Sequence, residues 1–207
     1  MARYTQAPPR CKRAIGPQDD PARVRPAAPA YAAPEKYTLD SSHAQIVFSY
    51  NHIGFSTGYG MVSGSAGDVM FDKADPAASS DSVSFPVRSM LPGWEERFEH
   101  FMSADFFDAA EDEMVSFAST AIGVTGDTTA QITGDLTLNG VIRPVVLDAV
   151  LNSQADAYPM APFEGKPAVG FSATPTISRS EFDPGNFVPF ISDEVQVQIS
   201  FEAMKLD

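Results

Sequence analysis

Apolar and polar residues alternate in short runs along most of the chain after residue 37. The clearest run, at 195–201, places Val, Val, Ile and Phe at alternate positions, with Gln, Gln and Ser between them. Because successive side chains of a strand point to opposite faces, this run predicts a strand with one buried face. Eight such runs, separated by turn signals such as Asn139-Gly140, predict an all-β domain with eight antiparallel strands. The predicted strands cover residues 44–51, 59–72, 81–90, 113–124, 129–139, 142–153, 167–180 and 193–206.

The first two predicted strands form a hairpin that is rich in glycine. Ile46, Phe48 and Tyr50 share one face of the first strand, and a turn over residues 52–55 leads into the second. Glycine within a strand marks a bend or the close approach of another group. We therefore expect a curved sheet edge at the glycines in positions 58, 60, 64 and 67.

One interval between the third and fourth predicted strands departs from this alternation. In residues 94–110, apolar side chains recur at the spacing of one helical face, at Trp94, Phe98, Phe101 and Met102. We expect a helix here, with Ser103 capping a second short turn that carries Phe106 and Phe107. A helical lid over about residues 94–108 would cover one mouth of an eight-stranded barrel. The interior of such a barrel is either filled by side chains or holds one small ligand.

The net charge of −13 is unevenly distributed. Residues 1–36 have seven Lys/Arg and three Asp/Glu, a net charge of +4, whereas residues 37–207 have seven and 24, a net charge of −17. A domain this acidic repels phosphate backbones, so nucleic acid is not an expected partner. Residues 1–36 are rich in Pro, Ala and Arg, which predicts a disordered basic tail or linker before a single domain at 37–207.

No targeting or membrane-spanning segment is recognisable in the sequence. No apolar stretch of about 7–15 residues follows the basic start, as a signal peptide would require. No run reaches the roughly 18 apolar residues of a transmembrane helix. Cys11 is the only cysteine, so an internal disulfide is impossible.

Groups that could perform chemistry are few. The three histidines, His43, His52 and His100, are enough to bind zinc, but no two of them have the close spacing of a typical ligand pair. No G-x-S-x-G motif occurs, and the acidic residues at 105–113 are more typical of a solvated face than of an acid–base pair. We predict no catalytic residue, metal or cofactor. The alternative is a metal-dependent or acid–base enzyme that uses the histidines and carboxylates near the lid.

Arg88 and Arg97 flank the predicted lid. One hypothesis is that either side chain meets the polar head of a ligand at the barrel mouth. The other is that each forms an ion pair with a nearby glutamate. Acidic residues are abundant and close in sequence, which favours the ion pair.

Five segments carry motifs of a known family in one order. They are residues 37–43, 52–56, 97–108, 134–145 and 170–182, which include Tyr37-Thr38-Leu39-Asp40, His52-Ile53-Gly54-Phe55, Gly134-Asp135-Leu136-Thr137 and Gly170-Phe171-Ser172-Ala173. Together they resemble the YceI-like family over about residues 37–207. The resemblance implies a lipocalin-like antiparallel barrel of eight strands, export to the periplasm, and an isoprenoid or other lipid chain bound inside the barrel.

The chain departs from the family pattern at the lid. The family commonly has Arg-Asp-x-His-Leu where this chain has Arg97-Phe98-Glu99-His100-Phe101. It often has Pro-Trp-Gly near the seventh strand, where this chain has Pro162-Phe163-Glu164-Gly165. The additional Phe residues predict a more apolar mouth than is usual for the family.

We therefore predict a non-enzymatic barrel that binds, and carries or stores, a long isoprenoid or fatty-acyl ligand. Arg88, Arg97 and His100 are the candidate contacts for a polar head group. A purely structural barrel with a packed interior is a third hypothesis, and a homodimer is left open. The expected wall residues are Ile46, Phe48, Tyr50, His52, Phe85, Phe98, Phe101, Phe106 and Phe171.

Overall fold

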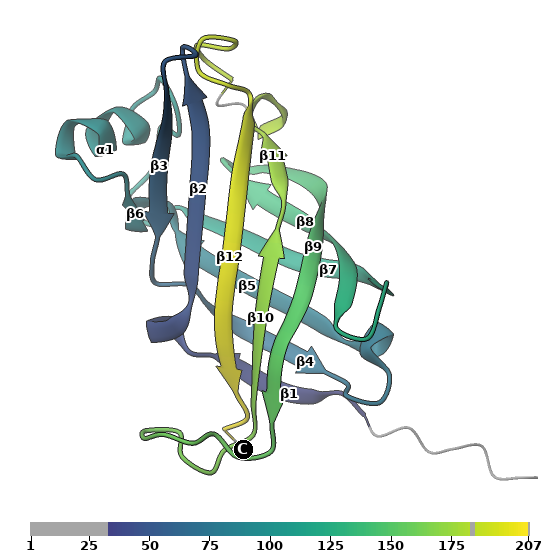
Figure 1. Ribbon diagram of the computed structural model, residues 1–207. Coiled ribbons are helices and arrows are strands. Elements are labelled where there is room, and N and C mark those ends of the chain that lie inside the picture. The colour runs from purple at the N-terminus through teal and green to yellow at the C-terminus, as the bar shows by residue number, and fades with distance from the viewer. Residues whose placement is uncertain (1–32, 183–184, 207) are drawn as a thin grey trace, which may run out of the picture. The chain divides into compact units, whose positions relative to one another are not determined.

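The computed structural model describes residues 33–182 and 185–206 (Figure 1). The tail predicted at 1–36 therefore lies almost wholly outside the described residues, although the first strand already begins at Glu35. The strands are β1 (Glu35–Leu39), β2 (Gln45–His52), β3 (Ser56–Val62), β4 (Ala66–Phe71), β5 (Ser80–Pro86), β6 (Met90–Leu91), β7 (Met114–Val124), β8 (Thr129–Leu138), β9 (Val141–Ala155), β10 (Ala168–Thr174), β11 (Thr176–Ser178) and β12 (Glu194–Met204). The helices are α1 (Glu95–Met102) and the short 3-10 helices η1 (Ser41–His43), η2 (Pro76–Ala78), η3 (Val87–Ser89) and η4 (Arg179–Phe182).

These strands combine into eight antiparallel barrel strands. β1 and β2 pair one after the other with the same edge of β12. On the far side of these two strands, β4 pairs with β1 and β3 pairs with β2. In the same way, β5 and β6 lie along β4 and β3, and β10 and β11 lie along the other edge of β12. β7, β8 and β9 complete the sheet between β5 and β10. Because β1, at one end of the strand order, also pairs with β12, the sheet closes into a barrel, which confirms the predicted fold class.

Glycine allows the barrel strands to bend and approach each other. Between β3 and β4 the chain turns at Gly64, which has a φ of +70°. At Gly67 a Cβ atom would overlap the main-chain oxygen of Ser82 on β5, so only glycine permits this pairing. The turn between β8 and β9 has positive φ at Asn139 (54°) and Gly140 (71°), which confirms the predicted tight hairpin.

The lid helix is shorter than the sequence spacing predicted. α1 ends at Met102, and the amide and hydroxyl groups of Ser103 both donate to the main-chain oxygen of His100, at 3.2 and 2.7 Å. These bonds satisfy the helix end, so the chain continues through turns at 104–107 and not through more helix. A helix at this place is therefore confirmed, although it is shorter than the predicted span to residue 110. The predicted second turn after Ser103 is also confirmed, because the amide of Asp105 donates to the Ser103 hydroxyl at 3.3 Å. No helix within residues 33–182 and 185–206 is long and apolar enough to span a bilayer.

Trp94 does not belong to the buried face of this helix. It precedes α1 with an extended backbone, and its residue is 58% exposed, so its predicted place in the apolar stripe was wrong. Phe101 and Met102 are buried as expected, and Phe98 is partly buried. The stripe is thus confined to the helix itself.

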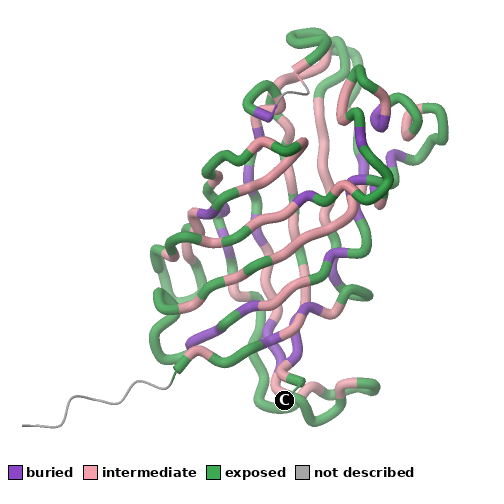
Figure 2. The backbone as a smooth tube through the Cα atoms, turned by 180° about the vertical axis from the view of Figure 1, so that it is seen from behind, coloured by how far each residue is buried: buried purple, intermediate pink, exposed green. Residues whose placement is uncertain are grey.

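The interior of the barrel is only partly filled by side chains. On β12, Val195, Val197 and Ile199 point inward by alternation, yet each is only partly buried. Figure 2 shows long partly buried stretches along the strands, with fully buried positions scattered between them. A packed core would bury these inward positions completely. The burial pattern therefore indicates a hollow barrel.

Candidate functional site

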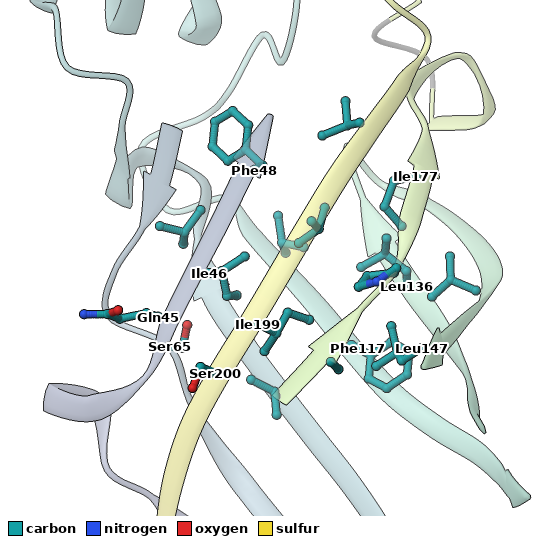
Figure 3. Close-up of a pocket in the computed structure, with 18 of the residues that line it drawn as sticks. Gln45, Ile46, Phe48, Ser65, Phe117, Leu136, Leu147, Ile177, Ile199 and Ser200 are labelled. Carbon is teal, nitrogen blue, oxygen red and sulfur yellow. The ribbon is translucent and has the colours of Figure 1, made fainter. Parts of the chain in front are cut away.

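The barrel encloses a cavity of about 1230 Å³. This volume exceeds the roughly 300–1,000 Å³ of ordinary small-molecule sites. Side chains from opposite walls point into it (Figure 3). The labelled apolar side chains are Ile46, Phe48, Phe117, Leu136, Leu147, Ile177 and Ile199. The cavity wall is predominantly aliphatic and aromatic, so it suits an apolar occupant.

Two aromatic side chains of β2 lie against glycines of β3. Tyr50 is paired with Gly58 and Phe48 with Gly60, and a Cβ atom on either glycine would overlap the facing ring. The absence of a side chain lets each ring rest on the neighbouring strand. This confirms the predicted close approach at these glycines, and it leaves space in the lumen that the rings would otherwise fill.

The lid closes over these two rings through phenylalanines. The ring centre of Phe101 lies 6.4 Å from that of Phe48 and 6.1 Å from that of Tyr50. Phe106, in the turn after α1, lies 5.5 Å from Phe101. The contacts of Phe101 with Tyr50 and Phe106 are edge-to-face, a favourable aromatic geometry, and its contact with Phe48 is tilted. The lid and β2 therefore form one continuous aromatic wall.

The structure brings eight of the nine predicted wall residues to the cavity. Phe98 is the exception, since it packs against the buried cluster around Val87 and does not line the cavity. The eight residues come from β2, β5, β10 and the lid, which are distant in sequence. They are Ile46, Phe48, Tyr50, His52, Phe85, Phe101, Phe106 and Phe171.

Two of the three candidate head-group contacts also line the cavity. The guanidinium of Arg97 donates to the main-chain oxygen of Pro92 at 3.1 Å and lies 5.9 Å from the ring centre of Trp94. Nε2 of His100 lies 3.1 Å from the carboxylate of Asp105. Both side chains therefore lie at the lid end of the lumen with protein partners already in place.

Arg88 lies away from the cavity wall. Its guanidinium donates to the main-chain oxygen of Ala109 at 3.1 Å and lies 3.6 Å from the carboxylate of Glu111. Glu111 follows the lid segment and is almost fully exposed, so this ion pair contributes little to stability. The arrangement favours the ion-pair hypothesis for Arg88 over the head-group hypothesis.

Arg179, at the start of η4, is a cavity residue that the sequence analysis did not single out. Its guanidinium donates to the main-chain oxygens of Ser192 at 2.9 Å and Ile191 at 3.1 Å, and lies 5.8 Å from the ring centre of Phe106. Burial lowers the pKa of Arg179, although the nearby Asp193 opposes this effect. Its partners come from separate segments, so no local pattern could have identified its position.

Two polar side chains of the cavity wall each have a buried oxygen without a hydrogen-bond partner among the described residues. Ser65 is 2% exposed, and its hydroxyl has no hydrogen-bond partner among the described residues. The Oδ1 atom of Asp81 is likewise without a partner in this part of the chain. Burial raises the pKa of Asp81, and an interaction with the side chain of Ser119 only partly offsets this effect. These two unpaired oxygens carry a desolvation cost within a predominantly apolar cavity.

The three histidines do not come together. His43 lies on η1, where its Nδ1 is 2.6 Å from the carboxylate of Asp40, and this hydrogen bond raises the pKa of His43. His52 ends β2, and His100 lies on α1. Within residues 33–182 and 185–206, no group of three or more His, Cys, Asp or Glu side chains is placed to hold a metal ion. Cys11 lies outside the described residues.

Comparison with known proteins places the domain in a wider group. A family model described as a YceI-like domain matches residues 37–203. A UPF0312 protein from Pseudomonas putida is 35% identical over 182 residues, which cover 86% of this chain and 90% of the relative. A UPF0312 protein from Ectopseudomonas mendocina is 36% identical over 171 residues, with coverage of 82% and 87%.

Solved structures share the same barrel. BcnA from Burkholderia cenocepacia has a TM-score of 0.69 at 21% identity and covers 79% of this chain and 98% of its own. A YceI protein from Campylobacter jejuni has a TM-score of 0.67 at 25% identity, with coverage of 76% and 90%. A polyisoprenoid binding domain from Saccharophagus degradans has a TM-score of 0.59 at 12% identity, with coverage of 82% and 98%.

Proposed function

Because this chain belongs to the YceI-like family, we propose that its barrel binds a long apolar ligand and carries or stores it. The observation that carries this proposal is the apolar cavity of about 1230 Å³ inside the closed barrel. The ligand class that we propose is an isoprenoid or fatty-acyl chain. The structural neighbour described as a polyisoprenoid binding domain supports the isoprenoid choice.

The energetics of burial fit a ligand of this class. Transfer of a chain of about ten methylenes from water to an apolar site stabilises a complex by roughly 8 kcal/mol before ordering costs. Useful affinity then requires no specific hydrogen bond. The wall around Leu136, Leu147 and Ile199 offers apolar area and few polar groups, as this mode of binding requires.

A polar end of the ligand would lie at the lid end of the lumen. Arg97 and His100 line the cavity there. Arg179 also lines the cavity, and its guanidinium lies 5.8 Å from the ring centre of Phe106. Each has protein partners, so a head group would share or exchange existing hydrogen bonds. We propose Arg97 and His100 as the head-group contacts and assign Arg88 to the ion pair.

The proposed function requires no chemical step. The enzyme alternative would need His43, His52 or His100 to act beside a metal or a second titratable group on a bound substrate. Metal analysis of the purified protein separates the two hypotheses. Stoichiometric zinc in the wild type that is lost when His52 or His100 is replaced would favour the enzyme hypothesis and contradict the proposed function.

A pair of substitutions on β9 tests whether the lumen is the binding site. Ala149 lines the cavity, whereas the next residue, Val150, points to the outside of the barrel. We expect Ala149→Phe to fill the lumen and weaken binding of a long-chain isoprenoid alcohol at least about tenfold, and Val150→Phe to leave binding unchanged. Trp94, the single tryptophan, lines the cavity and can report binding by fluorescence. Equal affinities of the two variants would contradict a luminal site.

We further propose that the protein works in the periplasm, as is expected for its family. Cell fractionation tests this location, and recovery of the protein in the cytoplasmic fraction would contradict it. A homodimer stays a prediction that light scattering can test. The lumen is formed within one chain, so the proposed ligand site does not depend on a second copy.

A further inference from the structure

Two neighbouring loops at the lid end of the barrel expose large apolar side chains. One is the turn between β2 and β3, where Phe55 is 91% exposed, and the other precedes β12, where Phe190 is 66% exposed. The two loops lie side by side at the end of the barrel where β12 begins (Figure 1). We call the exposed set Ile53, Phe55, Phe187, Val188 and Phe190 the apolar rim.

The apolar rim is held in place by hydrogen bonds. The amide of Ile53 donates to the main-chain oxygen of Phe190 at 2.7 Å, and the amide of Ser192 donates to that of Asn51 at 3.0 Å. The side chain of Asn51 also accepts from the amide of Gly54 at 2.7 Å. The exposure of these side chains is therefore built into the fold and does not come from a frayed segment.

The backbone of the rim is unusual for the residues it carries. Ile53 has a φ of +56° and Phe187 a φ of +66°, and both values lie in the left-handed region. This conformation is costly for a β-branched or bulky side chain, whereas glycine or asparagine adopts it readily. Ile53 is 49% and Phe187 47% exposed, and the ring of Phe187 also packs 5.6 Å from that of Phe106. Such strain on a surface loop is the kind of observation from which a functional role can be inferred.

The rim also differs in charge from the rest of the domain. Residues 37–207 have a net charge of −17, yet residues 51–57 and 185–192 contain no Lys, Arg, Asp or Glu. A bilayer penalises inserted charges and unpaired main-chain groups. The rim has no such charge, and two main-chain hydrogen bonds, from Ile53 to Phe190 and from Ser192 to Asn51, join the two loops. Its chemistry is thus matched to lipid.

We propose that the apolar rim inserts into the surface of a lipid bilayer. Ile53, Phe187 and Phe190 also line the mouth of the cavity, so docking would place that mouth against the lipid. This inference rests on the proposed function, because a long apolar ligand would then pass between bilayer and lumen without crossing water. The acidic domain favours a zwitterionic surface over an anionic one.

A bilayer fits the rim better than a protein partner does. A stable protein interface buries about 800 Å² on each partner and needs a broad complementary surface. The rim consists of five side chains on two loop tips. Side chains on such tips can each enter the headgroup region without a matching pocket.

Vesicle co-sedimentation with matched variants tests this proposal. We expect the full-length protein to bind phosphatidylcholine vesicles, and the Phe55→Ser/Val188→Ser variant, whose two positions do not line the cavity, to bind at least about tenfold more weakly. Met160→Ser is the control, because Met160 is 65% exposed in the loop between β9 and β10, at the opposite end of the barrel. Ile53→Asn should weaken vesicle binding while keeping or raising the melting temperature, since asparagine relieves the left-handed strain.

The outcomes separate the rim from the lumen. Binding of a monomeric isoprenoid alcohol, followed by Trp94 fluorescence, should survive the Phe55→Ser/Val188→Ser substitutions, because neither residue lines the cavity. Loss of vesicle binding with intact ligand binding supports the proposal. The proposal would be overturned if the wild type does not bind vesicles, or if Met160→Ser weakens vesicle binding equally. It would also be overturned if the rim substitutions convert a dimer to a monomer without weakening vesicle binding. Failure of ligand binding in the wild type would instead count against the proposed function.

Discussion

At the scale of single residues, the width of the lumen depends on glycines that face aromatic rings. Gly58 lies opposite Tyr50 and Gly60 opposite Phe48, and neither glycine has room for a methyl group. The rings therefore occupy space on the neighbouring strand and leave the lumen free. Glycine is usually unfavourable within a strand, so its use here exchanges local stability for cavity volume.

Replacement of Gly60 tests this relation. Gly60→Ala should push the Phe48 ring into the lumen, weaken isoprenoid binding and lower the free energy of unfolding by about 1–3 kcal/mol. Gly123→Ala on β7 is the control, because its added Cβ would meet only the Gln131 oxygen at an ordinary distance of 3.8 Å. Urea denaturation and ligand titration measure both effects. Similar results for the two variants would show that the ring does not depend on Gly60.

Asp81 gives a prediction about pH. Burial raises its folded-state pKa above the usual value of 3.8, so the folded protein holds this proton more tightly than the unfolded chain. The carboxyl group therefore lowers stability as pH rises from about 3.8 through its folded-state pKa. Asp81→Asn removes this cost at neutral pH.

We expect the melting temperature of Asp81→Asn to exceed that of the wild type at pH 7, by about 2–4 °C for each kcal/mol gained. The difference should shrink as pH falls toward 4. The exposed Asp112 provides a control, since Asp112→Asn should show no such trend. A constant difference between the Asp81 variant and wild type across this pH range would contradict an effect of ionisation.

At the scale of elements, the lid is joined to the barrel by its phenylalanines. Phe101 is buried between α1 and the aromatic residues of β2, while Phe98 on the same helix does not reach the cavity. Arg179 and Phe106 connect the turn after α1 to η4. The lid is therefore a packed part of the barrel end, with one phenylalanine as its main anchor.

Phe101→Ala should release this anchor. We expect a loss of about 3–5 kcal/mol in the free energy of unfolding, because a large side chain is removed from a buried site. Phe98→Ala should cost less, since Phe98 is only partly buried. Amide hydrogen exchange in residues 95–102 should be faster in Phe101→Ala than in Phe98→Ala. Equal exchange in both variants would exclude Phe101 as the anchor.

Sequence patterns predicted the elements whose signals are local. The alternation at 195–201 and the Asn139-Gly140 turn identify a strand and a hairpin without reference to the rest of the chain. β1 was missed because its segment starts with Glu35-Lys36 and has few apolar residues. The helix end was misplaced because Ser103 bonds back to the helix, which spacing alone does not reveal.

The candidate site was predictable only in part. Inward residues of β2 followed from alternation, since Ile46, Phe48 and Tyr50 occupy every second position. Arg179 was not found, because its contacts with Phe106 and the loop before β12 join segments distant in sequence. The open volume of the lumen depends on all eight barrel strands together, so no single segment encodes it.

At the scale of the whole molecule, the protein is a hollow barrel with room for an apolar chain. The pairing of β1 with β12 closes the sheet into a barrel, and the inward side chains leave about 1230 Å³ unfilled. An empty apolar cavity lowers stability because its lining loses packing contacts. A bound chain would restore these contacts, so ligand binding and folding stability should rise together.

The most direct test is mass spectrometry of an organic extract from protein purified without detergent. We predict a long-chain isoprenoid or fatty-acyl compound at close to one molecule per chain, strongly reduced in Ala149→Phe and retained in Val150→Phe. A folded wild-type protein that yields no apolar compound, and takes none up when long-chain isoprenoids and fatty acids are supplied, would contradict a luminal binding site for a long apolar chain.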